Sequence, residues 1–341
     1  MRFTKKHIIS LVVVVIVAYF LAAYQLDYYI QKPGTADALN PIVEVEGGYG
    51  SEGDMHLVTI SGGQATPIQY AWAMILPHSE IVPLDQVRPE GITEDEYMQA
   101  QLQMMESSQE ASTVVAYEAA NEDITIDYDG IYVVSVVEGM PADGKLQIGD
   151  RIIEIDGMDM HEAEDLINYV EDKEANDTIT LEVVRDEETL TEDVTLEEFS
   201  DADNKVGIGI SLVTDRDVTV DPEVNFSSGS IGGPSAGLMF SLEIYDQLTE
   251  TDITKGYEVA GTGEVDYDGN VLRIGGIDKK IVAADREGVD IFFAPNENGA
   301  EDSNYQVALE AAEEIDADMK IVPVDTFQDA LTYLQEINTN K

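Results

Sequence analysis

The 341-residue chain contains no cysteine, which excludes a thiol nucleophile and a disulfide-stapled fold. Its four histidines are His7, His56, His78 and His161, so residues 200–341 contain none. No Gly-x-x-x-x-Gly-Lys-Ser/Thr phosphate loop occurs, because Gly144-Lys145 is followed by leucine. We therefore expect no ATP-driven unfolding by this chain, and we expect no metal and no cofactor.

Basic residues are also scarce. All 69 acidic residues follow Leu26, where 15 of the 18 basic ones lie, so this part of the chain carries a net charge of −54. The acidic residues are taken to be spread over every segment, which favours a whole-surface adaptation to a saline habitat over an acidic interaction arm. Nucleic acid and anionic lipid surfaces are not expected as partners.

The N-terminus carries an apolar run from Ile8 to Leu26, with Ser10 and Gln25 as its only polar members. This is long enough for one membrane span. Basic residues precede the run and acidic ones follow it, which predicts a cytoplasmic N-terminus and an extracytoplasmic remainder. A cleaved signal peptide is the alternative. Residues 1–30 are expected to be a retained anchor in the cell membrane, because the run is long and tyrosines follow it as an interfacial belt.

The candidate nucleophile is Ser235, which lies on a glycine-lined turn before a predicted helix with Leu238, Met239, Leu242 and Tyr245 on one face. Unpaired N–H groups at that helix start favour an oxyanion beside the serine. The pattern Gly-x-Ser-x-Gly also fits the α/β-hydrolase elbow, but that fold needs a histidine after the serine, and none follows. The remaining activator is a neutral lysine, with Lys255, Lys279 and Lys280 as candidates.

These residues resemble the proteolytic domain of Lon proteases, a Ser-Lys dyad family. The motifs fall in the family's order: Gly-Pro-Ser-Ala-Gly at 233–237, Thr262-Gly263-Glu264, and Gly269 to Ile277 with a lysine three places further on. The resemblance covers roughly residues 206–341. It implies Ser235 as nucleophile and Lys280 as base, with Lys279 as a solvent-facing neighbour. The supporting residues that it implies are Thr262, Gly233, Pro234 and Ala236.

Residues 36–120 show strand-like runs at 42–45, 56–60 and 71–76, followed by a helix from about Glu94. Thr93-x-x-Glu96 is a capping box for that helix. The helix has a methionine-rich face, which is interpreted as core and given no cofactor role: Tyr97, Met98, Leu102 and Met105. We expect this segment to pack on the catalytic domain.

Residues 121–199 resemble a bacterial PDZ domain, with a strand from Ile131, a Pro-Ala turn, Gly149-Asp150-x-Ile-x-x-Ile-x-Gly, a helix and further strands. The resemblance implies capture of an extended peptide along the strand that contains Ile131, Tyr132 and Val133, beside the helix near Leu166. The alternative is a spacer between protease and membrane.

The whole chain is thus expected to be of α/β (α+β) class, with a transmembrane helix, a β-rich PDZ-like domain and a Lon-type proteolytic domain at 200–341. It resembles membrane-anchored PDZ and Lon-type serine peptidases of bacteria. This implies an ATP-independent endopeptidase that cleaves extracytoplasmic peptides or external segments of membrane proteins, possible as a homo-oligomer. The alternative functions are a catalytically inert PDZ binding scaffold at the cell surface and, less favoured without a histidine, a small-molecule esterase.

Overall fold

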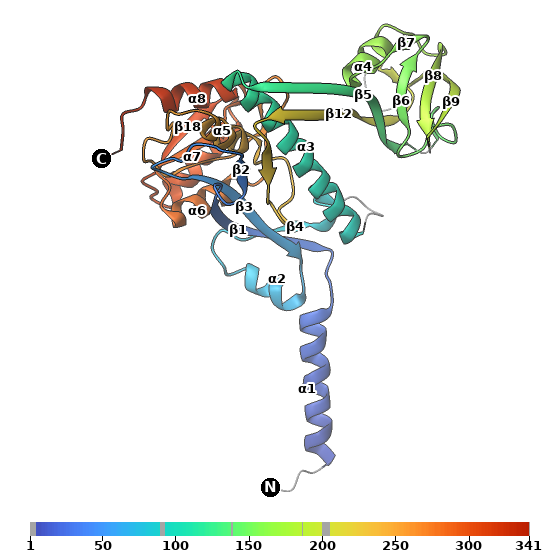
Figure 1. The fold of residues 1–341 in the computed structure, drawn as a ribbon. Helices are drawn as coiled ribbons and strands as arrows, with labels where there is room; N and C mark the ends of the chain where they lie inside the picture. The colour runs from blue at the N-terminus through green and yellow to red at the C-terminus, as the bar shows by residue number, and fades with distance from the viewer. Residues whose placement is uncertain (1–4, 89–92, 138, 186, 200–204, 341) are drawn as a thin grey trace. The chain divides into compact units, whose positions relative to one another are not determined.

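The computed structural model describes residues 5–88, 93–137, 139–185, 187–199 and 205–340. The chain divides into two compact units. Unit 1 comprises Met1–Asp123 and Val220–Lys341, and unit 2 comprises Ile124–Thr219. Unit 2 is therefore an insertion into unit 1, entered through strand β5 (Asp123–Val136) and left through strand β12 (Ile210–Asp221) (Figure 1).

Unit 1 is built on one six-stranded sheet in the order β18-β17-β14-β3-β1-β4. The pairs β3-β14, β14-β17 and β17-β18 are parallel, whereas β1 pairs antiparallel with β3 and β4. Residues 36–120 thus contribute strands to the sheet itself, where the sequence had indicated a segment packed against it. The reason is the parallel pairing of β3 with β14, which no local pattern reveals. The strands are β1 (Tyr28–Ala38), β3 (Met55–Gln64), β4 (Glu80–Pro83), β14 (Val259–Gly261), β17 (Ile291–Pro295) and β18 (Lys320–Val324).

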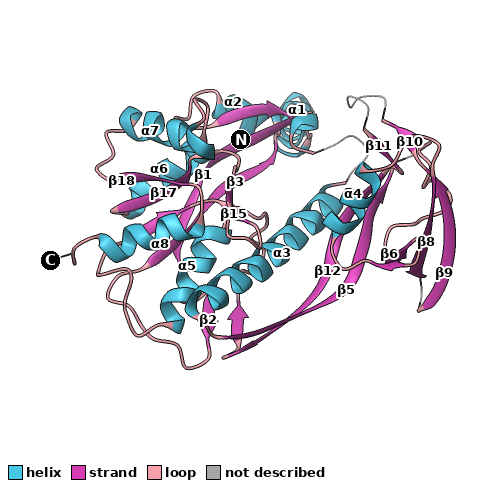
Figure 2. Cartoon of the chain, turned by 90° about the horizontal axis from the view of Figure 1, so that it is seen from above, coloured by secondary structure: helices cyan, strands magenta, loops and turns pink. Residues whose placement is uncertain are grey.

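Helices cover both faces of this sheet (Figure 2). Helices α6 (Ile277–Glu287) and α7 (Asn304–Glu314) pack on one face, and α5 (Gly237–Leu248) and α8 (Phe327–Glu336) on the other. The long helix α3 (Glu94–Ala120) packs on the outside of α5. Because α5 is enclosed by α3 and the sheet, all its residues except Tyr245 are buried, where the sequence predicted a single apolar face.

Two sequence predictions, one of a helix capping box and one of a strand, have opposite outcomes. The capping box at Thr93 and Glu96 is confirmed at the start of α3. The predicted strand at 71–76 is wrong, because α2 (Pro67–Ala73) lies there and a turn follows it. Thr66 and Gln69 form a capping box with Pro67 in the first turn, and this local start signal outweighs the strand-like apolar run.

Unit 2 has a sheet in the order β12-β5-β6-β8-β9, with β7 paired to β6. Helix α4 (Ala163–Glu171) packs its buried residues Ala163, Leu166 and Val170 into the same core. The remaining strands are β6 (Arg151–Ile155), β7 (Met158–Asp159), β8 (Thr178–Arg185), β9 (Glu188–Thr195) and the pair β10 (Glu197–Glu198) and β11 (Val206–Gly207).

The other elements of unit 1 are short, apart from α1 (Lys5–Ala23). This helix has no buried residue and a mean hydropathy of 2.3, so by length and composition it could cross a membrane. The short elements are β2 (Val43–Val45) paired with β13 (Val224–Phe226), β15 (Glu264–Val265) paired with β16 (Val271–Leu272), and two 3-10 turns at Leu84–Gln86 and Glu297–Gly299.

Candidate active site

A cleft of about 840 Å³ opens in unit 1 where α3, α6 and the turn before α5 meet β1 and β3. Ser235 and Lys280 both line it. Ser235 lies two residues before α5, and Lys280 lies in the first turns of α6. The two residues are 45 positions apart in the sequence, and the fold brings their side chains together.

The turn that carries Ser235 is held by α3. The Gly233 N–H donates to the Gln101 carbonyl at 2.8 Å, and the Ser108 hydroxyl donates to the Pro234 carbonyl at 2.9 Å. Gly232 is required by the close approach, since a Cβ there would lie 2.8 Å from the Cβ of Gln101. The backbone before the serine is thus held at two points by α3, a support that the sequence motifs did not reveal.

Lys280 reaches Ser235 from the opposite side of the cleft. Its Nζ lies 2.6 Å from Ser235 Oγ and 2.8 Å from Thr262 Oγ1. Lys280 is only 3% exposed, and this burial lowers the pKa of its ammonium from 10.5 to about 7. A substantial fraction of Lys280 is therefore neutral near pH 7, which is what a general base requires.

Thr262 joins the two residues. It is fully buried just beyond the end of β14, and its hydroxyl donates to the Ser235 carbonyl at 2.9 Å. Because that proton is used, the Thr262 oxygen remains free to accept from Lys280. This contact orients the amine towards Ser235 Oγ.

Two backbone amides beside the nucleophile are unpaired among the described residues. Within the described part of the chain, the N–H groups of Ser235 and Ala236 have no hydrogen-bond acceptor, whereas that of Gly233 is bound to Gln101. Pro234 has no N–H. The amides of Ser235 and Ala236 are therefore the unpaired donors that adjoin the nucleophile, and unpaired amides of this kind are able to stabilise negative charge on an acyl oxygen.

Lys279 is not solvent-facing, so that prediction is wrong. Its side chain is 3% exposed, and its Nζ lies 2.6 Å from Glu80 of β4 and 3.0 Å from Asp278. Burial by itself would lower the pKa of Lys279, but hydrogen bonds to Glu80 and Asp278 outweigh it and raise the pKa. Two adjacent buried lysines therefore have opposite electrostatic settings, and only Lys280 contacts Ser235.

The methionine-rich face of α3 is also not simply core. Met105 is buried, but Met98 is 44% exposed, and both line the cleft together with Tyr97. Besides Lys280, the ionisable Asp, Glu and Arg side chains at the cleft are Asp37, Glu264 and Arg273. The cleft thus offers an apolar wall on α3 and a mixed polar rim.

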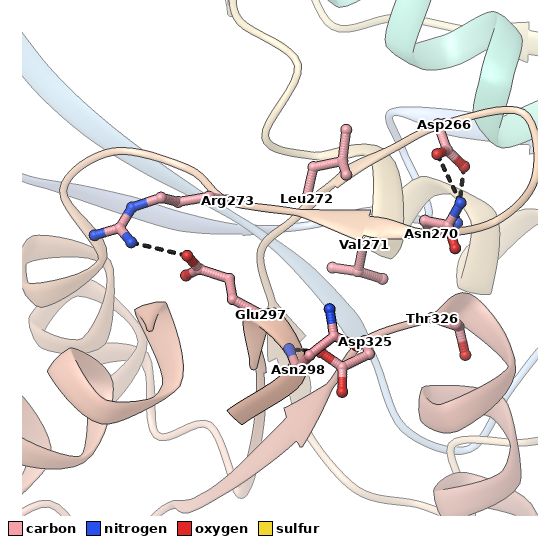
Figure 3. A pocket seen from close by; sticks show the side chains of 9 residues that line it. All are labelled: Asp266, Asn270, Val271, Leu272, Arg273, Glu297, Asn298, Asp325 and Thr326. Carbon is pink, nitrogen blue, oxygen red and sulfur yellow. Dashed lines mark hydrogen bonds and ion pairs between the residues drawn. The ribbon is translucent and has the colours of Figure 1, made fainter. Parts of the chain in front are cut away.

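A second cavity of about 430 Å³ lies beyond Arg273, which lines both (Figure 3). Its carboxylates are engaged in loop contacts: Asp266 accepts from Asn270, Glu297 from Arg273 and Asn304, and Asp325 from Asn296 and Asn298. Among the described residues, no cluster of three or more His, Cys, Asp or Glu side chains is arranged to hold a metal ion.

The strand expected from the sequence to pair with a peptide in the PDZ-like unit has no free edge in the structure. Ile131, Val133 and Leu166 are buried in the core of unit 2, and only Tyr132 is exposed. Strand β5, which carries Ile131, Tyr132 and Val133, is interior, between β12 and β6, so both its hydrogen-bonding edges are already used. The sheet ends at β12, whose Thr214 hydroxyl accepts from the first amide of α4 at 3.0 Å. The alternation of Ile210 and Leu212 in β12 was the signal that sequence reasoning missed.

A serine, a buried lysine and an orienting threonine beside unpaired amides are the parts of a serine hydrolase that uses a Ser-Lys pair. Comparison with known families identifies the two folds more narrowly. Residues 100–196 match the PDZ domain, and residues 202–336 match the Lon protease (S16) C-terminal proteolytic domain. The chain therefore combines a PDZ domain with the proteolytic domain of a serine peptidase, homologous to Lon proteases over its C-terminal region.

The relatives are whole Lon proteases of which this chain spans a small part. It is 37% identical over 99 residues to the Lon protease of Campylobacter concisus, covering 29% of this chain and 11% of that protein. It is 32% identical over 130 residues to the Lon protease of Neorickettsia sennetsu, covering 38% of this chain and 14% of that protein. Among solved structures, the PDZ domain of the SdrC-like protein from Listeria monocytogenes is 34% identical, with a TM-score of 0.25, covering 26% of this chain and 93% of that one.

Proposed function

We propose that this protein is a membrane-anchored serine endopeptidase that uses a Ser235/Lys280 dyad and needs no ATP. Its substrates are extracytoplasmic peptides or the external segments of membrane proteins. The observation that carries the proposal is the 2.6 Å approach of the buried Lys280 amine to Ser235 Oγ.

Acylation begins with neutral Lys280, which donates one N–H to Thr262 and turns its lone pair to the serine hydroxyl. Lys280 takes the proton of Ser235 as Oγ attacks the peptide carbonyl, and negative charge moves to the carbonyl oxygen. The amides of Ser235 and Ala236 stabilise that oxygen. The resulting ammonium of Lys280 then protonates the leaving amine, and the C–N bond breaks to leave an ester on Ser235.

Deacylation repeats the same proton transfers with water. Neutral Lys280 accepts a proton from a water molecule that attacks the ester carbonyl. The ammonium then returns that proton to Ser235 Oγ as the acid product leaves. Both halves need Lys280 to change protonation state near neutral pH, which agrees with a pKa of about 7.

The proposed location of the protein rests on α1 and on the charged residues at its two ends. Because basic residues precede the apolar run that begins at Ile8 and acidic ones follow it, the anchor would leave the N-terminus in the cytoplasm and both units outside. Substrate capture in unit 2 would use the sheet edge at β12, where an extended peptide can add as a further strand beside α4.

A fluorophosphonate probe separates this function from the alternative of an inert binding scaffold. The full chain should be labelled on Ser235 without added nucleotide, and Ser235→Ala should abolish the label. An unlabelled wild-type protein that still binds peptides would favour the scaffold.

A further inference from the structure

After the N-terminal apolar run, the longest stretch of this acidic chain without an acidic residue includes α2. About one residue in five is Asp or Glu, yet none occurs from Met55 to Ser79. The expectation that acid is spread over every segment is therefore wrong for this stretch. It contains β3, whose first four residues are buried, and α2 with the turn that follows it.

The exposed part of the stretch is strongly apolar. Ile68 and Trp72 on α2 are 55% and 60% exposed, and Met74 and Ile75 in the following turn are 70% and 71% exposed. Four large apolar side chains within eight residues are therefore exposed, and we call residues 68–76 the α2 apolar segment. Apolar patches of this kind on a water-soluble surface generally mark a contact site.

Hydrogen bonds tie the start of α2 to the chain just after α1. The Leu26 N–H donates to the Ala65 carbonyl at 2.8 Å, and the Ala65 N–H donates to the Tyr28 carbonyl at 2.8 Å. The Tyr28 ring also packs edge-on against Tyr70 of α2 at 5.1 Å. The α2 apolar segment therefore lies beside the end of α1 (Figure 1).

We propose that the α2 apolar segment is a second membrane contact, which lies in the headgroup region of the bilayer on the side where α1 ends. This inference rests on the proposed membrane anchor. Tryptophan and tyrosine favour the membrane interface because each has an apolar ring and a polar end. The lack of carboxylates removes the charge that would hold this surface in water, whereas the rest of the extracytoplasmic surface is acidic.

Together, α1 and the α2 apolar segment would hold the cleft close to the membrane. Tyr29, which lines the cleft, follows the last residue of α1 by six positions, at most about 20 Å of extended chain. The substrate class that this placement favours is the polypeptide segment next to a transmembrane helix, because such segments lie within that distance of the bilayer.

Trp72 is the only tryptophan of the chain, so the intrinsic tryptophan fluorescence reports on the α2 apolar segment alone. The full chain is reconstituted into phosphatidylcholine vesicles that contain lipids brominated either near the headgroup or near the chain end. We expect quenching that is stronger with the shallow bromines, together with protection from aqueous acrylamide. The double variant Met74→Ser/Ile75→Ser should lose much of the quenching. Leu309→Ser, an exposed apolar site on α7, is the matched control and should leave it unchanged.

The anchor is tested first, by resistance of the protein to extraction from the vesicles at alkaline pH. Extraction would refute the anchor and with it this inference. A protein that stays in the vesicles while Trp72 is quenched by acrylamide and not by bromine overturns only the second contact. Blue-shifted emission without bromine quenching also overturns it, since a second copy or another protein would then cover the segment.

Discussion

The neighbouring lysines Lys279 and Lys280 on α6 lead to a prediction about stability that can be tested without a substrate. Lys280→Met should stabilise the fold at low pH, whereas Lys279→Met should destabilise it near neutral pH. Both side chains are 3% exposed, but Lys280 contacts only the hydroxyls of Ser235 and Thr262, while Lys279 contacts the carboxylates of Glu80 and Asp278. The substitutions therefore remove the same charge from two opposite environments.

The size of the Lys280 effect follows from its pKa. Lowering the pKa from 10.5 to about 7 corresponds to about 5 kcal/mol that the folded state loses when the buried amine is charged. Below pH 7 both folded and unfolded states are protonated, so the full cost applies. Between about 7 and 10.5 only the unfolded state holds the proton, and wild-type stability rises with pH. Losing the two hydroxyl contacts offsets roughly 1–3 kcal/mol, so the net gain for Lys280→Met below pH 7 is about 3 kcal/mol.

The expected effect of Lys279→Met on the free energy of unfolding has the opposite sign. Its raised pKa means that it contributes stability that is fully present below its unfolded value of 10.5 and is lost as pH rises through the folded value. Glu80 is half exposed, so Lys279→Met should cost roughly 1 kcal/mol at neutral pH. That cost should shrink only in strongly alkaline solution.

Urea unfolding of the full chain in detergent, followed at pH values from about 6 to about 10, measures both effects. The free-energy difference between Lys280→Met and wild type should be largest at the acidic end and should fall steadily with pH. A difference that does not vary with pH would refute the assignment of a depressed pKa to Lys280. A Lys280→Met protein that is less stable than wild type at pH 6 would refute the burial argument itself.

Three further outcomes are expected. Burial raises the pKa of Glu243 from 4.5 to about 7, so wild-type stability falls as pH rises over that window. Glu243→Gln should therefore raise the free energy of unfolding above pH 7 by up to about 3 kcal/mol. Equal stabilities of variant and wild type at alkaline pH would contradict this. If β12 captures substrate, Val213→Glu, an exposed change on that strand, should slow cleavage of a full-length protein more than that of a short peptide, whereas equal rates would remove the role. Molar salt screens the acidic surface, so the melting temperature should rise and the base-limb pKa of the pH–rate profile should fall, and unchanged melting would argue against a saline adaptation.

The sequence located the catalytic candidates because their motifs are local. Gly-Pro-Ser-Ala-Gly, Thr262 and Lys280 each lie at a turn or helix start whose residues are contiguous, and the structure brings them together. Their chemical roles remain predictions. The PDZ and Lon-type folds were likewise predicted from local motif order and are supported by the family matches.

What the sequence could not reveal depends on distant partners. Lys279 is buried because Glu80, almost two hundred residues earlier, neutralises it. Strand β3 joins the sheet by pairing with β14, and β1 joins it by pairing with β3. Strand β12 completes the sheet of unit 2 although it follows the segment assigned to that domain. The run at 71–76 read as a strand since its apolar side chains were assumed to be buried, whereas most of them are exposed.

The pH dependence of peptide hydrolysis is the direct test of Lys280 as the catalytic base for Ser235. The full chain is assayed on a fluorogenic peptide without nucleotide, beside Ser235→Ala, Lys280→Met and Lys279→Met. We expect kcat/KM to rise with pH along a limb centred near 7, and the first two variants to lose about 10³-fold or more in kcat. Lys279→Met should keep the wild-type limb. A Lys280→Met enzyme that retains wild-type turnover, or a limb that stays in place when Lys280 is removed, would contradict the assignment of Lys280 as the base.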